Sequence, residues 1–508
     1  MTPILGFAGG LAVLLAAYRW SRVAQREHYI PGSCARTARR WLQVRPPNGV
    51  LGLIAIAALV GTVLQSPESW GGRIAFAAGI VLVATFPIGM PLRGNPPLKA
   101  TRRATTMMVA LLAVCTVLAV LLGLMRGPLA AVLVVGLLVP VVLDAVLLLL
   151  EPLERRASER FRQQAEQRLH RVDPYVIAVT GSWGKTSTKN HIRDLLVGSA
   201  DVVASPASWN NTAGLSRTVN EHLSESTEVL VAEMGMYGPG EIQSLCSWVR
   251  PRVSVVCAVG PMHLERVGSI EGIARAKEEI LELAEQAVLW VDEPLIAKME
   301  TTFSGKKVWR VGRLGGTDLD VAVDEAGDGK VDVYVGGEQI GSSEPGSGVH
   351  AGNVGCAVAA CLAYGASVGQ ISSRLITLTS PSHRGVVGTN DAGVYVVDDT
   401  FNSNPVGARA AVSQLSRAVS GKKVLVTPGM VELGQLQEAE NRALARSAVE
   451  RGMQVVVVGW TNRRALADGA GDDAVMVASR TEASRWVREH LGAGDGVVWE
   501  NDLPDHYP

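Results

Sequence analysis

Hydrophobic residues are concentrated in the first 150 positions of the chain, where they form five apolar runs. These runs cover about residues 4–18, 50–65, 72–90, 105–125 and 129–150. A helix needs roughly 20 apolar residues to cross the hydrocarbon core of a bilayer. The last two runs reach that length alone, whereas the first two are short and need their flanking residues. The pattern predicts an α-helical membrane domain of about five spans over residues 1–150.

Basic residues between the runs predict the orientation of these helices. Seven arginines lie between the first two runs, from Arg19 to Arg45, and four basic residues lie between the third and fourth, from Arg93 to Arg103. Cytoplasmic loops of membrane proteins are rich in Lys and Arg. We therefore expect a multi-pass protein of the inner (plasma) membrane, with its N-terminus outside and everything after residue 151 in the cytoplasm. A very apolar soluble helical domain is the alternative.

Two polar features adjoin the fifth run. Asp144 lies within it, where a charge is costly and needs a partner or water. Because Asp144 is near the end of the run, we interpret it as a hydrated acid, with a functional role as the alternative. Residues 151–172 carry Arg, Glu and Gln at helical spacing. They predict a solvated helical connector, whose arginines could also touch anionic lipid headgroups.

Residues 173–508 alternate between short apolar strands and amphipathic helices. This alternation is typical of doubly wound α/β domains. We expect a central domain over residues 173–380 and a second, Rossmann-like α/β domain over residues 381–508. The clearest predicted strands are 176–179, 201–204, 229–233, 253–259, 423–427 and 454–458, and the clearest helices are 188–197, 270–280, 405–419 and 437–452.

Composition narrows the class of protein only a little. The 508 residues contain 48 Lys and Arg against 48 Asp and Glu, so no overall charge points to nucleic acid, and we expect no nucleic-acid partner. The mean hydropathy of +0.20 reflects the N-terminal runs. Six cysteines show no CxxC pair or metal-ligand spacing. They are typical of reduced, buried side chains in a cytosolic environment.

The strongest chemical signal follows the strand at 176–179. Gly181-Ser182-Trp-Gly184-Lys185-Thr186-Ser187 leads from that strand into a polar helix start. Glycines allow backbone N–H groups to converge on phosphate oxygens, and the helix N-terminus adds partial positive charge. Lys185 supplies a mobile cation, and the Thr186 hydroxyl can bind Mg²⁺. The motif predicts a nucleoside triphosphate site, and a Gly-rich turn of any α/β protein is the alternative.

Three later residues are weaker candidates when taken singly. Glu233 ends a buried strand, at the edge of a parallel sheet where ligands bind, and is a candidate Mg²⁺ ligand or a turn-capping acid. His263 also follows a strand, yet a lone histidine is more often a hydrogen-bonded loop residue. Lys277 lies on an amphipathic helix and by itself is a surface lysine.

Together these segments resemble the Mur ligase family, most closely its MurF branch. The resemblance covers about residues 173–500 and rests on motifs in the family's order. They are Thr180–Thr186, Asn210-Asn211-x-x-Gly214, Glu233-Met-Gly235, Gly260-Pro-x-His263-Leu-Glu265 and Ala276-Lys277-x-Glu-Ile280. The resemblance implies an ATP-dependent ligase that joins a carboxylate to an amine through an acyl phosphate.

The resemblance also implies roles for individual residues. Thr186 and Glu233 would hold one Mg²⁺, and His263 would hold a second together with Lys277, which this family carbamylates. Hard Mg²⁺ prefers such oxygen ligands. Further residues are implied by position: Asn211 at the phosphates or second metal, Asn353 at adenine, Arg384 at ATP, Asp399 at the ribose, Asn402 and Asn404 at the domain cleft, and Glu432 near the amine substrate.

Departures from the family pattern concern the substrates. Membrane runs replace the N-terminal domain that binds the UDP-sugar peptide, and the chain ends Trp499-Glu500-Asn501-Asp502 where the branch has a basic Lys-Gly-Ser-Arg-like loop. The match at His350 to Asn353 is also one residue short.

We expect a carboxylate acceptor that is a peptide, lipid-linked or polymeric, a small amine, amino acid or dipeptide as the second substrate, and contact with membrane lipid. The leading hypothesis is a membrane-anchored ligase of peptidoglycan or cell-envelope synthesis. The alternatives are a ligase like the membrane-bound poly-γ-glutamate synthases and a non-ligase membrane ATPase switch.

Overall fold

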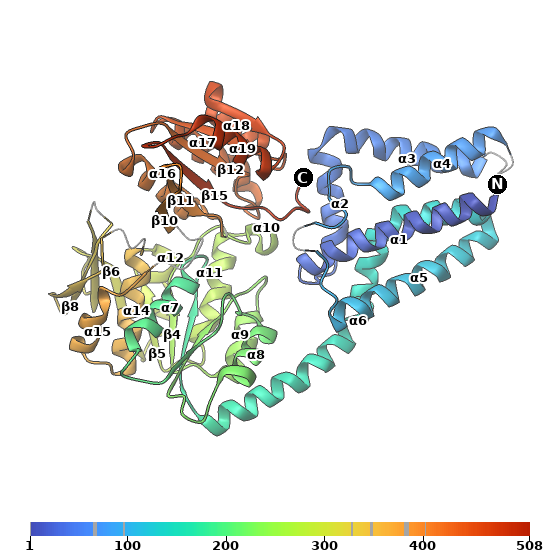
Figure 1. Ribbon diagram of the computed structural model, residues 1–508. Coiled ribbons are helices and arrows are strands. Elements are labelled where there is room, and N and C mark those ends of the chain that lie inside the picture. The colour runs from blue at the N-terminus through green and yellow to red at the C-terminus, as the bar shows by residue number, and fades with distance from the viewer. Residues whose placement is uncertain are drawn as a thin grey trace. The chain divides into compact units, whose positions relative to one another are not determined.

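The computed structural model describes residues 2–64, 69–94, 97–326, 329–345, 349–379, 386–401 and 403–508 (Figure 1). The chain divides into two compact units. The helical unit comprises Met1–Ala157 together with Gly459–Thr461 and Leu503–Pro508. The α/β unit comprises Ser158–Val458 and Asn462–Asp502. The boundary between the units therefore does not follow the order of the chain.

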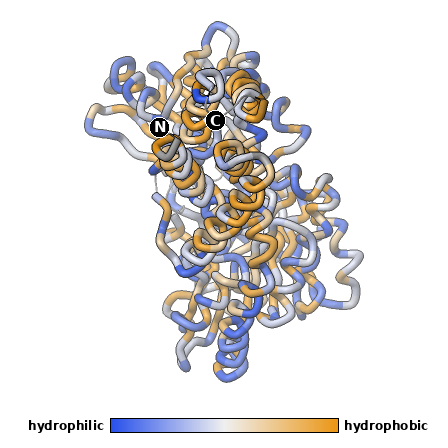
Figure 2. The backbone as a smooth tube through the Cα atoms, turned by 90° about the vertical axis from the view of Figure 1, so that its right-hand side faces the viewer, coloured by the Kyte–Doolittle hydropathy of each residue, from blue (hydrophilic) through white to orange (hydrophobic). Residues whose placement is uncertain are grey.

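The helical unit is built mainly from helices that carry long hydrophobic stretches, drawn in orange in Figure 2. The helices are α1 (Thr2–Arg26), α2 (Ser33–Val44), α3 (Pro46–Leu64), α4 (Trp70–Thr85), α5 (Arg102–Arg126) and α6 (Pro128–Val172). Among the described residues, four of them, α1, α3, α5 and α6, are long and apolar enough to cross a membrane.

The third predicted span is shorter than expected. Helix α4 has 16 residues and ends at Thr85, although its apolar run continues to about residue 90. Pro87 lies two residues beyond the end of the helix, and the residue before a proline is disfavoured in the helical conformation. Phe86 accordingly has extended backbone angles. Five spans were expected, but four helices of the described residues are long and apolar enough to cross a membrane.

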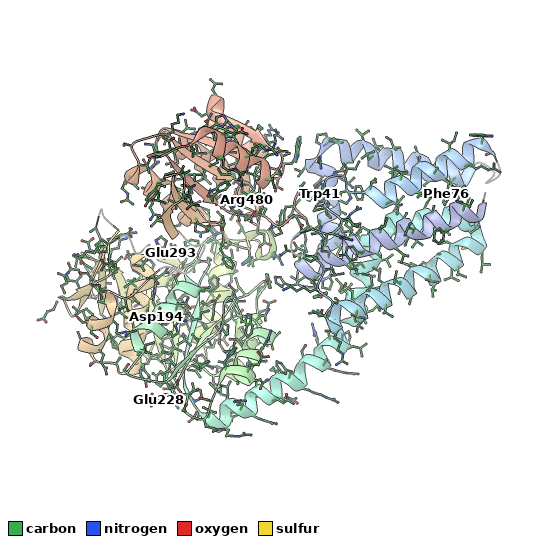
Figure 3. The ribbon with its side chains drawn as sticks, viewed as in Figure 1. Trp41, Phe76, Asp194, Glu228, Glu293 and Arg480 are labelled. Atoms are coloured by element: carbon green, nitrogen blue, oxygen red, sulfur yellow. The ribbon has the colours of Figure 1, made fainter. Side chains whose placement is uncertain are left out.

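Buried apolar side chains pack the helices against one another. Trp20, Phe76 and Leu111 are among the fully buried side chains of this core. Phe76 and Trp41 lie toward opposite ends of the bundle (Figure 3). Helices α4 and α6 approach closely, because a Cβ on Gly79 would lie 2.7 Å from the Leu133 side chain.

Asp144 caps helix α2 from within α6. Its two carboxylate oxygens accept hydrogen bonds from the backbone N–H groups of Cys34 (3.2 Å) and Ala35 (2.8 Å). These groups belong to the first turn of α2, where backbone donors have no partner within the helix and the helix dipole favours negative charge. The side chain is 6% exposed. Asp144 is therefore a buried structural acid, and the interpretation as a hydrated acid was wrong.

The segment Leu503–Pro508 packs into the helical unit. Asp505 forms an ion pair with Arg22, which is 1% exposed. The indole N–H of Trp41 donates to the His506 carbonyl (2.8 Å), and His506 Nε2 lies 2.8 Å from Glu27 Oε1. Residues from the two ends of the sequence therefore share one core.

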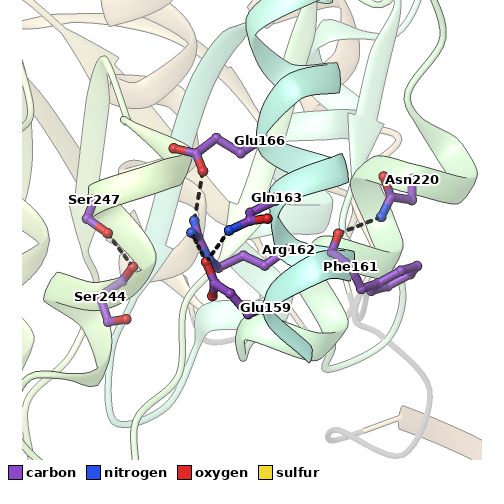
Figure 4. Close-up of polar contacts among 8 residues, drawn as sticks. All are labelled: Glu159, Phe161, Arg162, Gln163, Glu166, Asn220, Ser244 and Ser247. Carbon is purple, nitrogen blue, oxygen red and sulfur yellow. Dashed lines mark hydrogen bonds and ion pairs between the residues drawn. The ribbon is translucent and has the colours of Figure 1, made fainter. Parts of the chain in front are cut away.

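The predicted connector is continuous with the last apolar run, because both belong to the single 45-residue helix α6. Its polar half carries ion pairs between residues one helical turn apart. Arg162 binds Glu159 and Glu166 at i−3 and i+4, and Asn220 Nδ2 donates to the Phe161 carbonyl at 3.1 Å (Figure 4). The connector is thus helical, and most of its side chains are exposed.

The central domain contains a sheet of nine strands among the described residues, in the order β2-β3-β1-β4-β5-β6-β7-β8-β9. Strands β1 to β7 pair in parallel, and β8 and β9 add an antiparallel edge. The strands are β1 (Tyr175–Thr180), β2 (Val202–Ala204), β3 (Val229–Glu233), β4 (Val253–Val256), β5 (Gln286–Trp290), β6 (Lys307–Arg313), β7 (Val321–Glu325), β8 (Val331–Val335) and β9 (Glu338–Ser342).

Helices cover both faces of this sheet, so β1, β3 and β4 are almost entirely buried and mainly apolar. The helices are α7 (Lys185–Leu196), α8 (Thr212–His222), α9 (Glu241–Val249), α10 (Leu264–Val267), α11 (Ile270–Glu278), η1 (Glu279–Leu281), α12 (Pro294–Ala297), α13 (Met299–Thr302), α14 (Ala351–Tyr364) and α15 (Val368–Leu375).

The C-terminal domain has a six-stranded sheet among the described residues, in the order β10-β11-β15-β12-β13-β14, parallel except for β10. Its strands are β10 (Val386–Thr389), β11 (Tyr395–Asp399), β12 (Lys423–Thr427), β13 (Met453–Val458), β14 (Ala474–Val477) and β15 (Gly496–Glu500). Its helices are α16 (Pro405–Ala418), η2 (Gly434–Leu436), α17 (Gln437–Val449), α18 (Arg463–Ala470), η3 (Gly471–Asp473) and α19 (Arg480–His490). The two predicted α/β domains are therefore both present.

Candidate active site

The Gly-rich loop lies at the carboxyl end of β1, between the neighbouring strands β3 and β4. Gly184 ends the loop with φ of 79°, a left-handed conformation that favours glycine. A Cβ at this position would also lie 2.2 Å from Asn353 Oδ1. Helix α7 begins at the next residue, so its first N–H groups face the carboxyl edge of the sheet, where anions bind.

The loop is held to the segment after β4 by a reciprocal pair of hydrogen bonds. Ser182 Oγ donates to the Gly260 carbonyl (3.1 Å) and accepts from the Gly260 N–H (2.9 Å). The Ser182 N–H donates to the Ala258 carbonyl at 2.8 Å. A Cβ on Gly181 would meet Cys257 Sγ at 2.5 Å. These contacts hold the loop against the segment that follows β4.

Lys185 folds back over this loop. Its Nζ donates to the Gly181 carbonyl at 2.7 Å, and its side chain is only partly buried. The ammonium group therefore lies beside the backbone that would surround a phosphate. It can turn toward a phosphate by rotation of its side chain alone.

Glu233 is the centre of a buried polar cluster next to the loop. The Thr186 hydroxyl donates to Glu233 Oε2 (2.8 Å), and Asn210 Nδ2 donates to Oε1 (3.0 Å). Lys189 Nζ lies 3.2 Å from Oε2 and also donates to the Ala207 carbonyl (2.6 Å). The side chains of Lys189 and Glu233 are each 1% exposed. The Thr186–Glu233 pairing expected of a metal site is present, with a buried lysine neutralising the carboxylate.

Lys277 is enclosed on α11 rather than exposed. Its side chain is 2% exposed. Burial, with a smaller contribution from the nearby Lys185 charge, holds the pKa of the Lys277 ammonium well below its ordinary value. The unprotonated amine is therefore readily formed at this position.

His263 contacts the C-terminal domain instead of Lys277. Its Nδ1 lies 2.7 Å from Glu432 Oε2, and Arg266 donates to Glu432 Oε1 at 2.6 Å. Burial alone would raise the pKa of the Glu432 carboxyl, but His263 and Arg266 outweigh it and lower that pKa to about 2. His263 Nδ1 is thus occupied by this carboxylate, and the shared metal role predicted for His263 and Lys277 stays a prediction.

The described residues contain no group of three or more His, Cys, Asp and Glu side chains arranged to hold a metal ion. The metal roles of Thr186, Glu233, His263 and Lys277 remain predictions. For the first position the donor chemistry suits a hard cation, since a hydroxyl and a carboxylate already converge there.

A pocket opens beside the loop, lined by residues of both α/β domains. The central domain contributes Trp183, Ser187 and Trp290, and the C-terminal domain contributes Asp399 and Asn404. The aromatic rings offer apolar faces, and Asp399 offers oxygen acceptors. The pocket is therefore suited to a nucleotide whose phosphates lie at the loop.

Two predicted contact residues also have local structural roles. Asn211 caps α8 by accepting from the Gly214 N–H at 2.9 Å, whereas its neighbour Asn210 contacts Glu233. Asn353 also lines the pocket, but its side chain lies against Gly184, and its Oδ1 accepts a hydrogen bond from the Thr188 hydroxyl at 3.4 Å. Arg384 and Asn402 lie outside the described residues.

Sequence reasoning missed Lys189 and Arg266 as site residues. Lys189 follows Lys185 by one helical turn, which places both on the same side of α7. That spacing was the available signal. Arg266 lies three residues after His263, and its partner Glu432 is 166 positions away in sequence. No local pattern indicates such a contact.

Comparison with protein families matches the α/β unit. The Mur ligase middle domain matches residues 179–361, and the Mur ligase glutamate ligase domain matches residues 384–500. The first match contains the loop, Glu233 and His263, and the second contains the C-terminal sheet.

Individual relatives agree with this assignment. The UDP-N-acetylmuramoyl-tripeptide–D-alanyl-D-alanine ligase of Mycobacterium leprae is 32% identical over 363 residues, covering 64% of this chain and 70% of that protein. The Bacillus subtilis enzyme of the same name is 34% identical, covering 54% and 61%. Crystal structures of MurF from Acinetobacter baumannii (TM-score 0.59, 24% identity, 68% and 77% coverage) and of MurF from Thermotoga maritima with ADP (0.58, 24%, 68% and 80%) share the fold. The chain therefore belongs to the Mur ligase family, whose members are ATP-dependent enzymes that form carbon–nitrogen bonds.

Proposed function

We propose that the chain is a membrane-anchored, ATP-dependent ligase of MurF type that forms an amide bond in peptidoglycan synthesis. The names of its relatives suggest a peptide carboxylate and D-alanyl-D-alanine as the substrates. The observation that carries the proposal is the buried pairing of Thr186 with Glu233 beside the Gly-rich loop. A hydroxyl and a carboxylate at this edge of the sheet suit the triphosphate end of ATP.

The reaction has two balanced steps. A carboxylate oxygen attacks the γ-phosphorus of ATP, the bond from that phosphorus to the bridging oxygen breaks, and ADP leaves. The amine nitrogen then attacks the acyl carbon, the carbon–oxygen bond to phosphate breaks, and phosphate leaves as the nitrogen loses a proton. The protein must neutralise charge on the moving phosphoryl group and hold both substrates in line.

This chain's residues suit those two tasks. Lys185 and the N–H groups at the start of α7 would bind the phosphoryl oxygens, and Arg384 would add a second cation. Asp399 and Asn404 would hold the nucleotide from the C-terminal domain. Contact between Glu432 and the His263–Arg266 pair would keep the two α/β domains together around the substrates.

Mg²⁺ fits the donor groups of the proposed site. Thr186 and Glu233 would hold one ion, and His263 with a carbamylated Lys277 would hold another. When bound, the ions supply positive charge that stabilises the transferring phosphoryl group. The lowered pKa of Lys277 supports carbamylation, because only the unprotonated amine reacts with carbon dioxide.

Membrane anchoring is supported by the four long apolar helices of the helical unit. The proposed location is the inner (plasma) membrane, with the α/β unit in the cytoplasm, where ATP is available. An enzyme held there could take a lipid-linked or polymeric carboxylate instead of a soluble nucleotide-linked peptide. The test is partition of the full chain after washing membranes with high salt and alkaline carbonate. Release into the wash would contradict the anchoring.

The activity is tested by phosphate release from ATP with the purified full chain. D-Alanyl-D-alanine and a UDP-linked muramoyl tripeptide should both be required. Lys185→Met should abolish release, whereas Lys298→Met, at an exposed lysine of the same unit, should not. Phosphate release that ignores both substrates would favour an ATPase switch. Release that needs glutamate and a polymer would favour the poly-γ-glutamate alternative.

Carbamylation is tested at Lys277. Lys277→Ala should lose most of the activity, and millimolar acetate should restore part of it by supplying a carboxylate in the emptied space. Full activity without acetate would contradict the metal role of this lysine.

A further inference from the structure

Arg19 is a buried arginine near the C-terminal end of α1. The residue is 6% exposed. One terminal nitrogen donates to the Phe86 carbonyl at 2.7 Å, and its buried Nε has no hydrogen-bond partner. Within the described residues no ion pair is found for Arg19. A guanidinium carries five N–H donors and a permanent charge, and this one is matched by a single backbone carbonyl.

Arg22, one turn along the same helix, differs in one respect. It is 1% exposed and pairs with Asp505, while a second nitrogen donates to the Pro91 carbonyl at 2.7 Å. Its charge is thus compensated by a carboxylate, yet its buried Nε also has no partner. Two guanidiniums therefore lie one turn apart on α1, and the carboxylate of Asp505 pairs with Arg22.

The loop after α4 fixes the arginines in place. The carbonyls of Phe86, Ile88 and Pro91 accept hydrogen bonds from Arg19, Arg45 and Arg22, respectively. The loop backbone lies directly on Arg22, since a Cβ on Gly94 would lie 1.8 Å from its guanidinium nitrogen. Side chains held in this way lose little rotamer freedom when a ligand binds, which favours affinity.

A buried cation without a counter-ion is costly, and native proteins pair it or supply an anion. In a membrane protein, Arg at the end of a span lies at the level of the lipid phosphates. The same helix presents Leu11 and Leu14, each about half exposed, one to two turns before Arg19. Along the axis of α1, exposed apolar side chains therefore precede the arginines, as lipid chains lie deeper in the bilayer than the headgroup.

We propose that Arg19, supported by Arg22, binds the phosphate group of an anionic lipid at the end of α1. The planar guanidinium donates two parallel hydrogen bonds to a phosphate, which a lysine cannot do. The proposal rests on the membrane-anchoring part of the proposed function and is independent of the ligase reaction. A lipid-linked substrate that carries a phosphate group would bind at the same arginines.

The test uses the full chain in an uncharged detergent and native mass spectrometry of bound lipid. The probes are phosphatidylglycerol against diacylglycerol, and undecaprenyl phosphate against undecaprenol, so each pair differs in its phosphate-bearing headgroup. Inorganic phosphate is the soluble competitor. The variants are Arg19→Gln, Arg19→Lys and, as a matched control, Arg39→Gln, which removes an exposed arginine of α2.

We expect both phosphate lipids to bind at least tenfold more tightly than their phosphate-free partners. Arg19→Gln should remove most of that preference, Arg19→Lys should retain part of it, and Arg39→Gln should change affinity less than twofold. Circular dichroism checks that the variants fold. If Arg19→Gln does not fold, the comparison of Arg19→Lys with the wild type still tests the proposal. Equal binding of both members of each pair would overturn the proposal, as would full displacement by millimolar inorganic phosphate. Lipid binding and amine-dependent phosphate release are separate readouts, so either proposal can fail alone.

Discussion

Glu500 ends β15 as a fully buried carboxyl group that lacks a full set of partners. One oxygen is hydrogen-bonded to the Thr427 hydroxyl, and the other has no partner. Asp399 is its neighbour in register on β11. Burial and the Asp399 charge raise the pKa of Glu500, against the opposing Thr427 hydrogen bond, to about 8. Glu500→Gln replaces the carboxyl by a neutral group of nearly the same shape.

The sign of the effect follows from proton linkage. Below pH 4.5, the ordinary pKa of this carboxyl, folded and unfolded chains both carry the proton. As pH rises, the unfolded chain releases it while the folded chain keeps it, so the free energy of unfolding falls until pH passes about 8. Each pKa unit is worth about 1.4 kcal/mol, which makes the loss about 3 kcal/mol at pH 7 and about 5 kcal/mol above pH 8. Glutamine avoids this loss.

We therefore expect Glu500→Gln to melt a few degrees above the wild type at pH 8.5, with the difference shrinking toward pH 5. The assay is scanning fluorimetry of the full chain in detergent across this range. Glu438→Gln, at a carboxylate that is 60% exposed, is the matched control and should show no such trend. A difference between Glu500→Gln and wild type that stays constant with pH would refute the reasoning.

Three further predictions concern other buried contacts. Gly184→Ala should weaken binding of a fluorescent ATP analogue at least tenfold because its Cβ would collide with Asn353, whereas Gly198→Ala, also at positive φ but in open space, should not. Asp144→Ala should lower the melting temperature by the equivalent of about 1–3 kcal/mol, since two N–H groups of α2 lose their acceptor, and Asp144→Asn should lower it less. Glu432→Gln should destabilise the chain by about 2–3 kcal/mol at pH 7, and the difference should fade as pH drops from 4.5 toward 2, because the lowered pKa stabilises only the ionised carboxylate. An equal penalty at pH 3 and pH 7 would contradict this account.

Features that depend on neighbouring residues were predictable. The strand, loop and helix around Gly184 form one continuous segment, because a phosphate site needs adjacent N–H groups, glycines and a lysine. The position of Glu233 at the end of a buried strand was predictable in the same way, because it depends on one local segment. The resemblance to the Mur ligase family joined these segments and is confirmed by the comparisons.

Features that depend on distant residues were not predictable. The partner of His263 is a glutamate of the other α/β domain, and the partner of Asp144 is the backbone of α2, 109 positions earlier. Hydrophobic periodicity predicts which face of an element is buried, but it does not predict which residues of another element pack against that face. The third span was predicted to be longer than helix α4 for a different reason. The hydrophobic residues continue to about residue 90, whereas the helix ends before Pro87.

The contacts of Leu503–Pro508 set an order on the synthesis of the protein. The helices of residues 1–157 are synthesised first, but Arg22 and Glu27 can contact Asp505 and His506 only after the end of the chain has been made. At roughly 5–20 residues per second, ribosomes need about 20–70 s to make the intervening chain. During that interval Arg22 and Glu27 lack their contacts with the C-terminal segment. A ribosome that stops early leaves this unit incomplete, so the N-terminal helices complete their packing only on chains whose ligase domains have been made.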